Sequence, residues 1–500
     1  MNFYSYINIG VSEFFLLFGI GFIFLLGIQQ VVGGNINSIS YFWFDRLLKI
    51  SLIVLFLYMF SLLCFFNYNL DLVSKFDQSF YILFFKICLV LILFFVLVLC
   101  VYFVRYELIY EMEFLLLLLI SLCGMLSMLL SNDFLVLYLG MEIQSFCFYV
   151  LAGFKKGNLK STEGSLKYFV LGSLASGFFL YGVSVLYGLT GSLVFSEIEL
   201  LLSEFVLLNS SSFIFGISYV NFGLLFILIG FFFKMGIVPF HFWVPDIYEG
   251  SPALVTCFFS LVTKIVLVAV LVRFLYFYGL IFITVWQNVF MILGLLSVLI
   301  GAFGALFQTN FLRFIGYASI NHAGYILIGL SLATLEGVEA ALVYLVIYLI
   351  LGLALFFSML SVYRVNNNLR IMEFGEVQEL VTSHPYLSGV LCLNLFSFAG
   401  IPPLLGFFGK FYIFMALAEL KLYVVLIILS LAGLVSAFYY IRIIRNMYFE
   451  ELSRFSFFSE IPKVIGFFIG FFVVLNIFGF FLISPIVLWM KLVVISLVMR

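Results

Sequence analysis

Long apolar runs separated by short polar connections occupy the chain from one end to the other. A helix needs about 20 apolar residues to cross the hydrocarbon core of a bilayer. Segments of this kind lie near residues 11–32, 43–66, 79–104, 112–131, 133–154, 164–189, 213–240, 250–276, 281–307, 311–333, 337–363, 384–418, 421–449 and 463–490. The pattern predicts an all-α integral membrane protein of about 14 transmembrane helices, because a helix satisfies its backbone hydrogen bonds within lipid.

Two of these segments, the seventh and the twelfth, are long and interrupted. The seventh contains Lys234-Met-Gly-Ile-Val-Pro239, and the twelfth contains Ala399-Gly-Ile-Pro-Pro403 with Lys410 seven residues further on. Broken helices at corresponding places in two halves are typical of transporters built from inverted repeats. We therefore expect two inverted five-helix repeats with broken helices 7 and 12. The expected divisions are an N-terminal three-helix segment (1–110), a first repeat of helices 4–8 (111–280), a second repeat of helices 9–13 (281–450) and a C-terminal helix (451–500).

The composition supports a single polytopic membrane domain. Hydrophobic residues make up 66% of the 500 residues and charged residues 9%, whereas soluble domains carry about a quarter charged residues. The net charge of −1 offers no basic surface for nucleic acid. Seven cysteines without a CxxC pair argue against a disulfide framework or iron–sulfur ligation. No GxGxxG motif is present, and Gly409-Lys410 is followed by Phe411, so neither dinucleotide nor P-loop phosphate binding is supported.

Charges in the predicted loops indicate an orientation. Loops after odd-numbered helices hold Arg105, Lys155, Lys156, Lys160, Arg364, Arg370, Arg454 and Lys463. Loops after even-numbered helices hold Lys75 and Lys421 and are otherwise acidic, with Asp71, Glu197, Glu199, Glu204, Glu336 and Glu339. Because basic loops stay on the cytoplasmic or matrix side, we expect the N-terminus on the opposite, positive side of the membrane.

Four charged residues lie deep within apolar segments. Glu142 is midway along the fifth, and Lys234, Lys264 and Lys410 lie in the seventh, eighth and twelfth. Insertion scales assign about 2.5–3.5 kcal/mol to a charged residue at a helix centre, so such residues are usually functional. A chain of buried lysines with one glutamate can pass a proton when neighbouring charges and hydration change. The alternative is that these residues form static pairs that specify helix packing.

Two further residues are secondary candidates, and a histidine has an expected structural position. His322 in the tenth segment could relay protons with its near-neutral pKa, or act as a structural hydrogen-bonding group. Lys167, near the matrix end of the sixth segment, is either a partner for Glu142 or an interfacial lysine whose ammonium reaches the membrane surface. His241 is expected in a re-entrant loop after the break in the seventh segment.

Longer motifs carry a family resemblance. They are Met141–Tyr149, Ser161–Tyr168, Phe233–Pro252, Tyr317–Tyr325 and Gly400–Tyr412, within a region of about 130 to 450. With these motifs, and above all its Lys-x-x-x-x-Pro-Phe-His-x-Trp-x-Pro-Asp core, the chain resembles the antiporter-like subunits of respiratory complex I and of multisubunit Na+/H+ antiporters. The resemblance is strongest to the NADH dehydrogenase subunit 2 branch. It implies that Glu142, Lys234, Lys264 and Lys410 form a polar axis at the membrane midplane. A lysine at position 410 fits subunit 2 better than subunit 4, which usually has glutamate there.

The resemblance implies a proton-translocating membrane-arm subunit of NADH:ubiquinone oxidoreductase, driven by quinone reduction elsewhere in the complex. NADH, FMN, iron–sulfur clusters and ubiquinone would then belong to partner subunits, with no cofactor or redox centre in this chain. Its partners would be the other membrane-arm subunits and the lipid bilayer. Two alternatives stay open: a subunit of a multisubunit Na+/H+ antiporter, and a non-conducting structural spacer.

The composition and the N-terminus also bear on location. The 69 phenylalanines fit an AT-rich organellar genome, and the first ten residues have no basic or Arg-rich targeting pattern. We expect the mitochondrial inner membrane, with a bacterial plasma membrane as the alternative.

Overall fold

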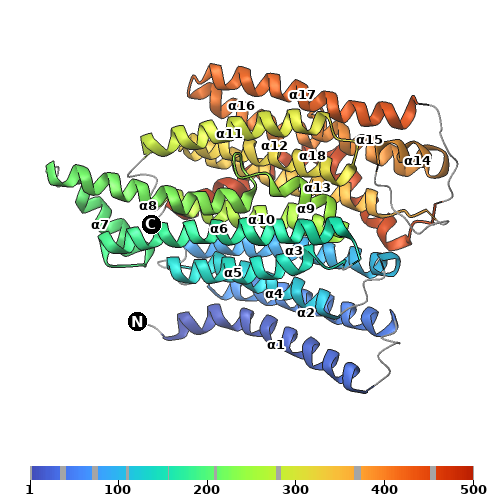
Figure 1. Cartoon of the computed structure of the whole chain (residues 1–500), viewed down its shortest axis with the longest axis horizontal. Coiled ribbons are helices and arrows are strands. Elements are labelled where there is room, and N and C mark those ends of the chain that lie inside the picture. The colour runs from blue at the N-terminus through green and yellow to red at the C-terminus, as the bar shows by residue number, and fades with distance from the viewer. Residues whose placement is uncertain are drawn as a thin grey trace.

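The computed structural model describes residues 3–33, 41–69, 77–107, 112–155, 157–207, 211–276, 283–364, 373–450 and 458–498. Within these residues the regular elements are helices, and β-structure is limited to isolated bridges such as that between Asp133 and Val194. Most of the helices run side by side in one bundle, with their long axes in a common direction (Figure 1).

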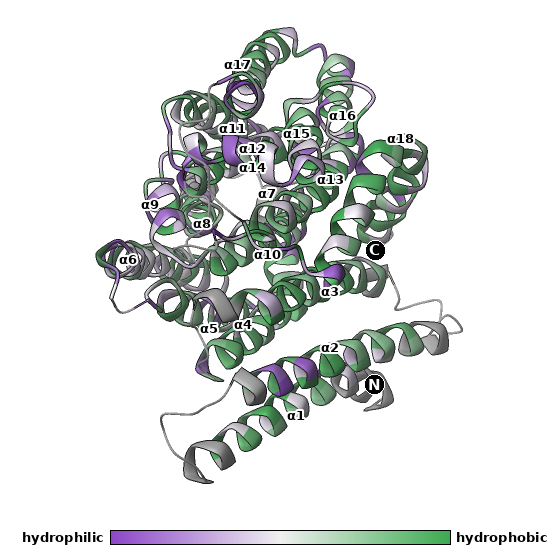
Figure 2. Cartoon of the chain, turned by 90° about the vertical axis from the view of Figure 1, so that its right-hand side faces the viewer, coloured by the Kyte–Doolittle hydropathy of each residue, from purple (hydrophilic) through white to green (hydrophobic). Residues whose placement is uncertain are grey.

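The N-terminal segment consists of α1 (Phe3–Gly33), α2 (Tyr41–Asn69) and α3 (Asp77–Glu107). Helices α1 and α2 lie along one side of the bundle, whereas α3 lies within it (Figure 2). Helix α3 packs against α10 (Ala253–Phe274) and α18 (Lys463–Val498). The Tyr81 hydroxyl of α3 donates a hydrogen bond to the Ala269 carbonyl of α10 at 2.8 Å. Helix α3 therefore joins the N-terminal hairpin to the rest of the protein.

The first half of the bundle continues to α10. Its other helices are α4 (Met112–Leu130), α5 (Phe134–Ala152), α6 (Leu159–Thr190), α7 (Phe195–Leu207), α8 (Ser211–Met235) and α9 (Trp243–Gly250). Small residues allow α4 and α5 to approach closely, since a Cβ added at Gly124 would lie 2.9 Å from the Gly140 carbonyl oxygen. Close contact through small residues is the usual basis of helix packing in membranes. The acidic connection after α6, expected as a loop, contains helix α7.

The second half begins after α10. It contains α11 (Ile283–Leu306), α12 (Phe311–Ser331), α13 (Leu335–Leu360), the short helices η3 (Phe374–Glu376) and α14 (Gln378–Ser383), then α15 (Pro385–Ala399), α16 (Leu405–Glu419), α17 (Tyr423–Tyr448) and α18. Helix α10 lies at the centre of the bundle, where all of its residues are buried. Helix α13 is also almost entirely buried and contacts α10, α12, α15, α16 and α18. These central helices bring the two halves into contact.

Ten helices of the described part are long and apolar enough to cross a membrane, judged by length and composition. Three shorter apolar stretches, Ser12–Ile28, Tyr219–Met235 and Pro385–Ala399, fall below that length. Large apolar side chains also cover much of the outer surface, as at Phe18, which is 78% exposed. The prediction of an all-helical membrane protein is therefore confirmed, while the total of fourteen spans stays a prediction.

Candidate functional site

The first helix break lies between α8 and α9. Helix α8 ends at Met235, and Gly236 adopts the left-handed conformation with φ of 73°. The indole N–H of Trp243 donates to the Phe233 carbonyl at 3.0 Å, which occupies an acceptor near the end of α8. His241 is buried in the turn before α9, in the re-entrant connection that the sequence predicts. The chain is therefore interrupted where Gly-Ile-Val-Pro predicts it.

Lys234, in the last turn of α8, is buried and extends to α5. Its ammonium donates a hydrogen bond to the Met141 carbonyl at 2.8 Å. The neighbouring Glu142 is half-buried, and its charge acts on Lys234. The Ser145 hydroxyl lies 3.4 Å from the Glu142 carboxylate. The structure thus brings Glu142 and Lys234 together, with the ammonium held by backbone beside the carboxylate.

The second break, between α15 and α16, has a similar construction. Helix α15 ends at Ala399, and Gly400 is left-handed with φ of 91°. The Lys410 ammonium of α16 donates to the Phe398 carbonyl at 3.2 Å and to the Ala399 carbonyl at 2.9 Å. The last carbonyls of a helix have no intrahelical partner and carry a partial negative charge. Lys410 therefore caps the broken end of α15.

Lys264 lies on α10 at the centre of the bundle and is 2% exposed. Its ammonium donates to the Ser319 carbonyl of α12 and to the Tyr348 hydroxyl of α13 at 3.2 Å. It also lies 4.5 Å from the centre of the Tyr348 ring. The Tyr348 hydroxyl in turn donates to the Ser260 carbonyl at 3.1 Å. The buried ammonium is thus held by polar groups from two neighbouring helices, α12 and α13.

His322 of α12 lies between Lys264 and Lys410, whose charges both act on its ring. Its Nδ1 is 2.7 Å from the Tyr344 hydroxyl, and its Nε2 is 3.2 Å from the Tyr440 hydroxyl. A neutral imidazole donates through one nitrogen and accepts through the other. One tyrosine therefore accepts a hydrogen bond from the ring while the other donates to it.

Two small cavities border His322, and Lys410 also borders one of them. One of about 30 Å³ is bordered by Ser319, Tyr348 and His322. Another of about 10 Å³ is bordered by His322, Tyr344, Tyr348 and Lys410. One water molecule needs roughly 10–15 Å³ and two or more polar partners. The region between Lys264 and Lys410 therefore combines hydroxyl groups, an imidazole and space for water.

Lys234, Lys264 and Lys410 share the absence of a carboxylate in direct contact among the residues that the structure describes. Among the described residues, none of Lys234, Lys264 and Lys410 takes part in a salt bridge within 4.0 Å. The static ion pairs of the alternative interpretation are thus not present at these lysines. Their ammonium groups are stabilised by carbonyl and hydroxyl oxygens, which do not fix a proton as strongly as a contacting carboxylate does.

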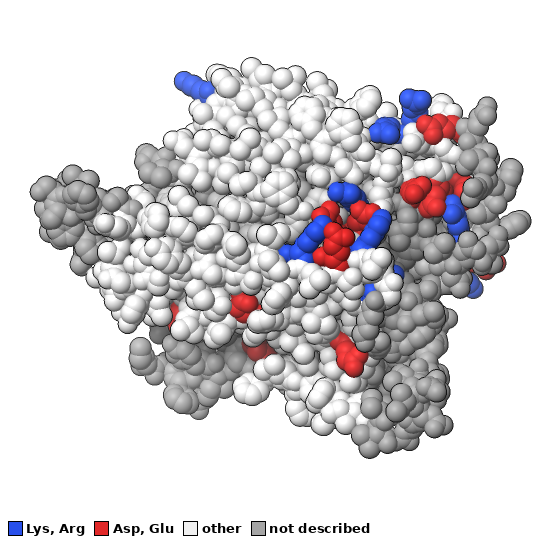
Figure 3. All heavy atoms as spheres, in the orientation of Figure 1, with Lys and Arg blue, Asp and Glu red and all other residues white. Residues whose placement is uncertain are grey.

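Lys167 lies apart from this row. It is 44% exposed and contacts Asp246 at 2.9 Å, within a cluster of charges on one face of the protein (Figure 3). The cluster consists of Lys160, Lys167, Arg313, Glu163, Asp246 and Glu249. Its acids on α9 meet cations from both α6 and α12, as in the 3.3 Å contact of Arg313 with Asp246. Lys167 therefore helps to hold the short helix α9 and does not contact Glu142.

Sequence reasoning missed the tyrosines of the site. Tyr344 and Tyr348 are four residues apart on α13, so they lie on one face of that helix. That spacing of hydroxyl groups inside an apolar run was the available signal. Tyr440 of α17 had no such signal, because only the packing of α17 shows that it reaches His322.

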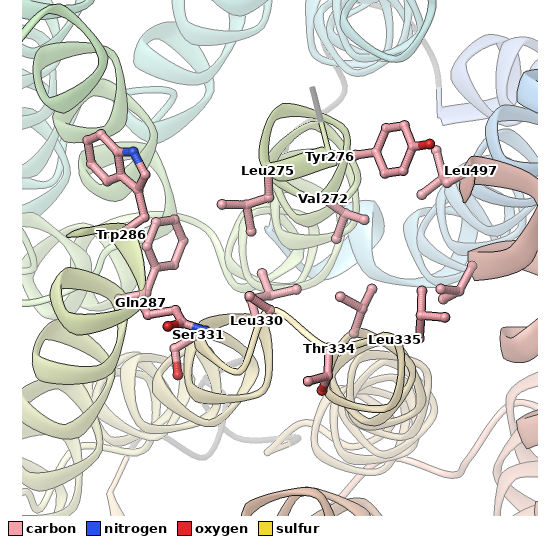
Figure 4. A pocket seen from close by; sticks show the side chains of 14 residues that line it. Val272, Leu275, Tyr276, Trp286, Gln287, Leu330, Ser331, Thr334, Leu335 and Leu497 are labelled. Atoms are coloured by element: carbon pink, nitrogen blue, oxygen red, sulfur yellow. The ribbon is translucent and has the colours of Figure 1, made fainter. Parts of the chain in front are cut away.

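A larger cavity of about 280 Å³ lies elsewhere, between the ends of α10, α11, α12, α13 and α18 (Figure 4). Side chains such as Leu275, Phe290 and Leu330 make it mostly apolar. It contains none of the buried lysines. Among the residues that the structure describes, no group of histidine, cysteine or acidic side chains is placed to hold a metal ion.

Several known proteins are similar to this chain in sequence or in structure. The family described as NADH:quinone oxidoreductase/Mrp antiporter, TM, matches residues 131–436. NADH-quinone oxidoreductase subunit N of Pelagibacter ubique is 39% identical over 450 residues, which are 89% of this chain and 90% of that protein. NADH-ubiquinone oxidoreductase chain 2 of Marchantia polymorpha is 37% identical over 70% of each chain. A chain of respiratory complex I from Thermus thermophilus superposes with a TM-score of 0.74 at 25% identity, covering 95% of this chain and 98% of its own.

Proposed function

The chain belongs to the NADH:quinone oxidoreductase/Mrp antiporter transmembrane family, and on this premise we propose that it is a proton-translocating membrane-arm subunit of respiratory complex I. The observation that carries the proposal is the row of buried lysines without contacting carboxylates, two of them at helix breaks. The names of its relatives, which are oxidoreductase subunits, favour complex I over a separate Na+/H+ antiporter.

Within this function, Glu142 and Lys234 form the first part of the relay. The carboxylate stabilises the ammonium, and a change in that attraction alters how firmly the lysine keeps its proton. Lys234 is held by one backbone carbonyl, so it can lose its proton without breaking an ion pair. The pair therefore acts as a gate whose state depends on nearby charge.

Lys264, His322 and Lys410 form the second part. A proton that leaves Lys264 has the His322 imidazole and a water-sized cavity between it and Lys410. Tyr344 and Tyr440 keep both ring nitrogens in hydrogen bonds, so the imidazole can accept a proton on one side and release it on the other. Lys410 then holds the proton against the carbonyl end of α15.

The proposed architecture has fourteen spans with two inverted repeats, at 111–280 and 281–450, flanked by segments 1–110 and 451–500. Each repeat would contain one broken helix, formed by α8 with α9 and by α15 with α16. Both breaks combine a left-handed glycine, a following Ile and a lysine that serves the relay. Unwound backbone at membrane depth is tolerated beside a polar cavity, which supports this assignment.

The redox chemistry would lie in partner subunits that hold NADH, FMN, iron–sulfur clusters and ubiquinone. This chain would contribute charge movement, as one component of an NADH:quinone reductase. Its surroundings would be other membrane-arm subunits and the lipid of a mitochondrial inner membrane or a bacterial plasma membrane.

The test is the variant Lys264→Met in the assembled complex, reconstituted in vesicles. We expect assembly to persist on a native gel while the number of protons pumped per NADH oxidised, or the coupled rate, falls strongly. Lys491→Met, which removes an exposed lysine from α18, is the matched control and should pump normally. Normal pumping by Lys264→Met would contradict the proposed function.

A further inference from the structure

A buried ion pair lies outside the relay, in the N-terminal helices. The Lys86 ammonium of α3 contacts the Glu13 carboxylate of α1. Lys86 is 6% exposed, and the Ser12 hydroxyl donates to the other oxygen of Glu13 at 2.8 Å. Both residues lie outside the region 131–436 that matches the family. The pair is therefore not part of the shared set of lysines described above.

A third polar group reaches the same place from α2. Tyr58 is fully buried, and its hydroxyl has no hydrogen-bond partner among the described residues. The charge of the Glu13 carboxylate acts on this tyrosine. A buried hydroxyl without a partner costs about 1–3 kcal/mol. The unused donor of Tyr58 is thus available near the carboxylate of Glu13.

The ion pair lies at the depth of the central relay. Helices α3 and α10 run in opposite directions, because Tyr81 contacts Ala269 while Cys100 interacts with Cys257. Lys86 follows Tyr81 by five residues, and Lys264 precedes Ala269 by five. At about 1.5 Å per residue, both lysines are therefore about 7.5 Å from the same contact, towards the same side of the membrane.

Such a pair is expensive to place in a membrane. Each charge costs about 2.5–3.5 kcal/mol at a helix centre, and a buried ion pair is often no more stabilising than apolar residues of equal size. Packing alone therefore does not account for it. We propose that Glu13 and Lys86 form a second membrane-embedded proton-binding site, through which the N-terminal helices take part in proton transfer.

The proton transfers at this site are simple to balance. Transfer from the Lys86 ammonium to the Glu13 carboxylate gives a neutral acid and a neutral amine, with no change in net charge. Uptake of an outside proton by Glu13 gives a neutral acid beside an ammonium, which adds one positive charge. The Glu13 side chain is 19% exposed against 7% for that of Lys86, so Glu13 is the more accessible member of the pair.

The inference rests on the proposed function, and its test uses the assembled complex in vesicles. Glu13→Gln and Lys86→Met should each lower the protons pumped per NADH oxidised by at least a fifth, with assembly retained on a native gel. Asp45→Asn and Lys49→Met are matched controls, because they break an ion pair within α2 whose lysine is 64% exposed. Both controls should pump normally.

Three results separate the possibilities. A normal number of protons pumped per NADH oxidised in both Glu13→Gln and Lys86→Met would overturn the inference. If Lys264→Met lowers that number in the same experiments, the proposed function stays intact. If a single variant fails to assemble, the double variant Glu13→Gln/Lys86→Met leaves no unpaired charge and decides the matter. Full assembly with full pumping in the double variant would make the pair purely structural, whereas assembly with reduced pumping would support the proton site.

Discussion

Gly400→Ala perturbs the second helix break without removing any charged group. Gly400 has φ of 91°, and the added Cβ would lie 3.2 Å from Cδ and 3.4 Å from Nζ of Lys410. A residue other than glycine in such a conformation costs about 1–3 kcal/mol. The contact with Cδ is also tighter than usual, so the lysine must move by a few tenths of an ångström.

That movement affects the hydrogen bonds that cap α15. Lys410 donates to Ala399 at 2.9 Å and to Phe398 at 3.2 Å, and the longer bond is closer to the limit of useful geometry. A hydrogen bond to a charged group is worth about 1.5–3 kcal/mol. Because each 1.36 kcal/mol changes a rate tenfold, loss of one such bond should slow proton transfer through Lys410 by roughly ten- to a hundredfold.

The assay is NADH-driven proton pumping in vesicles, with assembly checked on a native gel. Gly470→Ala on α18 is the matched control, since its Cβ would meet no described heavy atom within 4 Å. The control should assemble and pump like the unaltered protein. A fully active Gly400→Ala complex would refute the idea that the left-handed glycine positions Lys410.

Two further outcomes are expected. Lys410→Ala should assemble but turn over slowly. Ser436→Ala, which removes a 3.4 Å contact to the same ammonium, should be nearly normal on the same assay. Loss of assembly by Lys410→Ala would favour a packing role instead. An impermeant thiol reagent should label single cysteines introduced at Gly157 and at Glu197 from opposite sides of the membrane. Gly157 should be labelled from the matrix or cytoplasm. The reverse accessibility would contradict the orientation drawn from loop charges.

The sequence allowed much of this site to be predicted, because charge inside an apolar run is rare. Lys234, Lys264 and Lys410 can be identified because each lies within an apolar run, and glycine with proline marks both helix breaks. Their hydrogen-bond partners were not predictable in the same way. The Ser319 and Met141 carbonyls are backbone groups, which any residue supplies, and only helix packing selects them.

The contact partner of a charged side chain also depends on how the helices pack. Lys167 had two possible roles, and its position on α6 places it against Asp246 of α9. Glu13 and Lys86 were not among the four charged residues singled out from the sequence, and nothing in the sequence pairs residues on helices α1 and α3. Periodicity identifies a helix, whereas the partner of a polar side chain follows from the tertiary arrangement.

The gate formed by Glu142 and Lys234 provides the most direct test of the central claim that buried charges carry protons. Glu142→Gln, Lys234→Met and the double variant should be compared for NADH-to-quinone turnover and proton pumping in the same vesicles. Because each residue acts through the charge of the other, each single variant should lower turnover and pumping together, and the double variant should lose clearly less than the sum of the two. Strictly additive losses, or normal pumping by either single variant, would contradict the account.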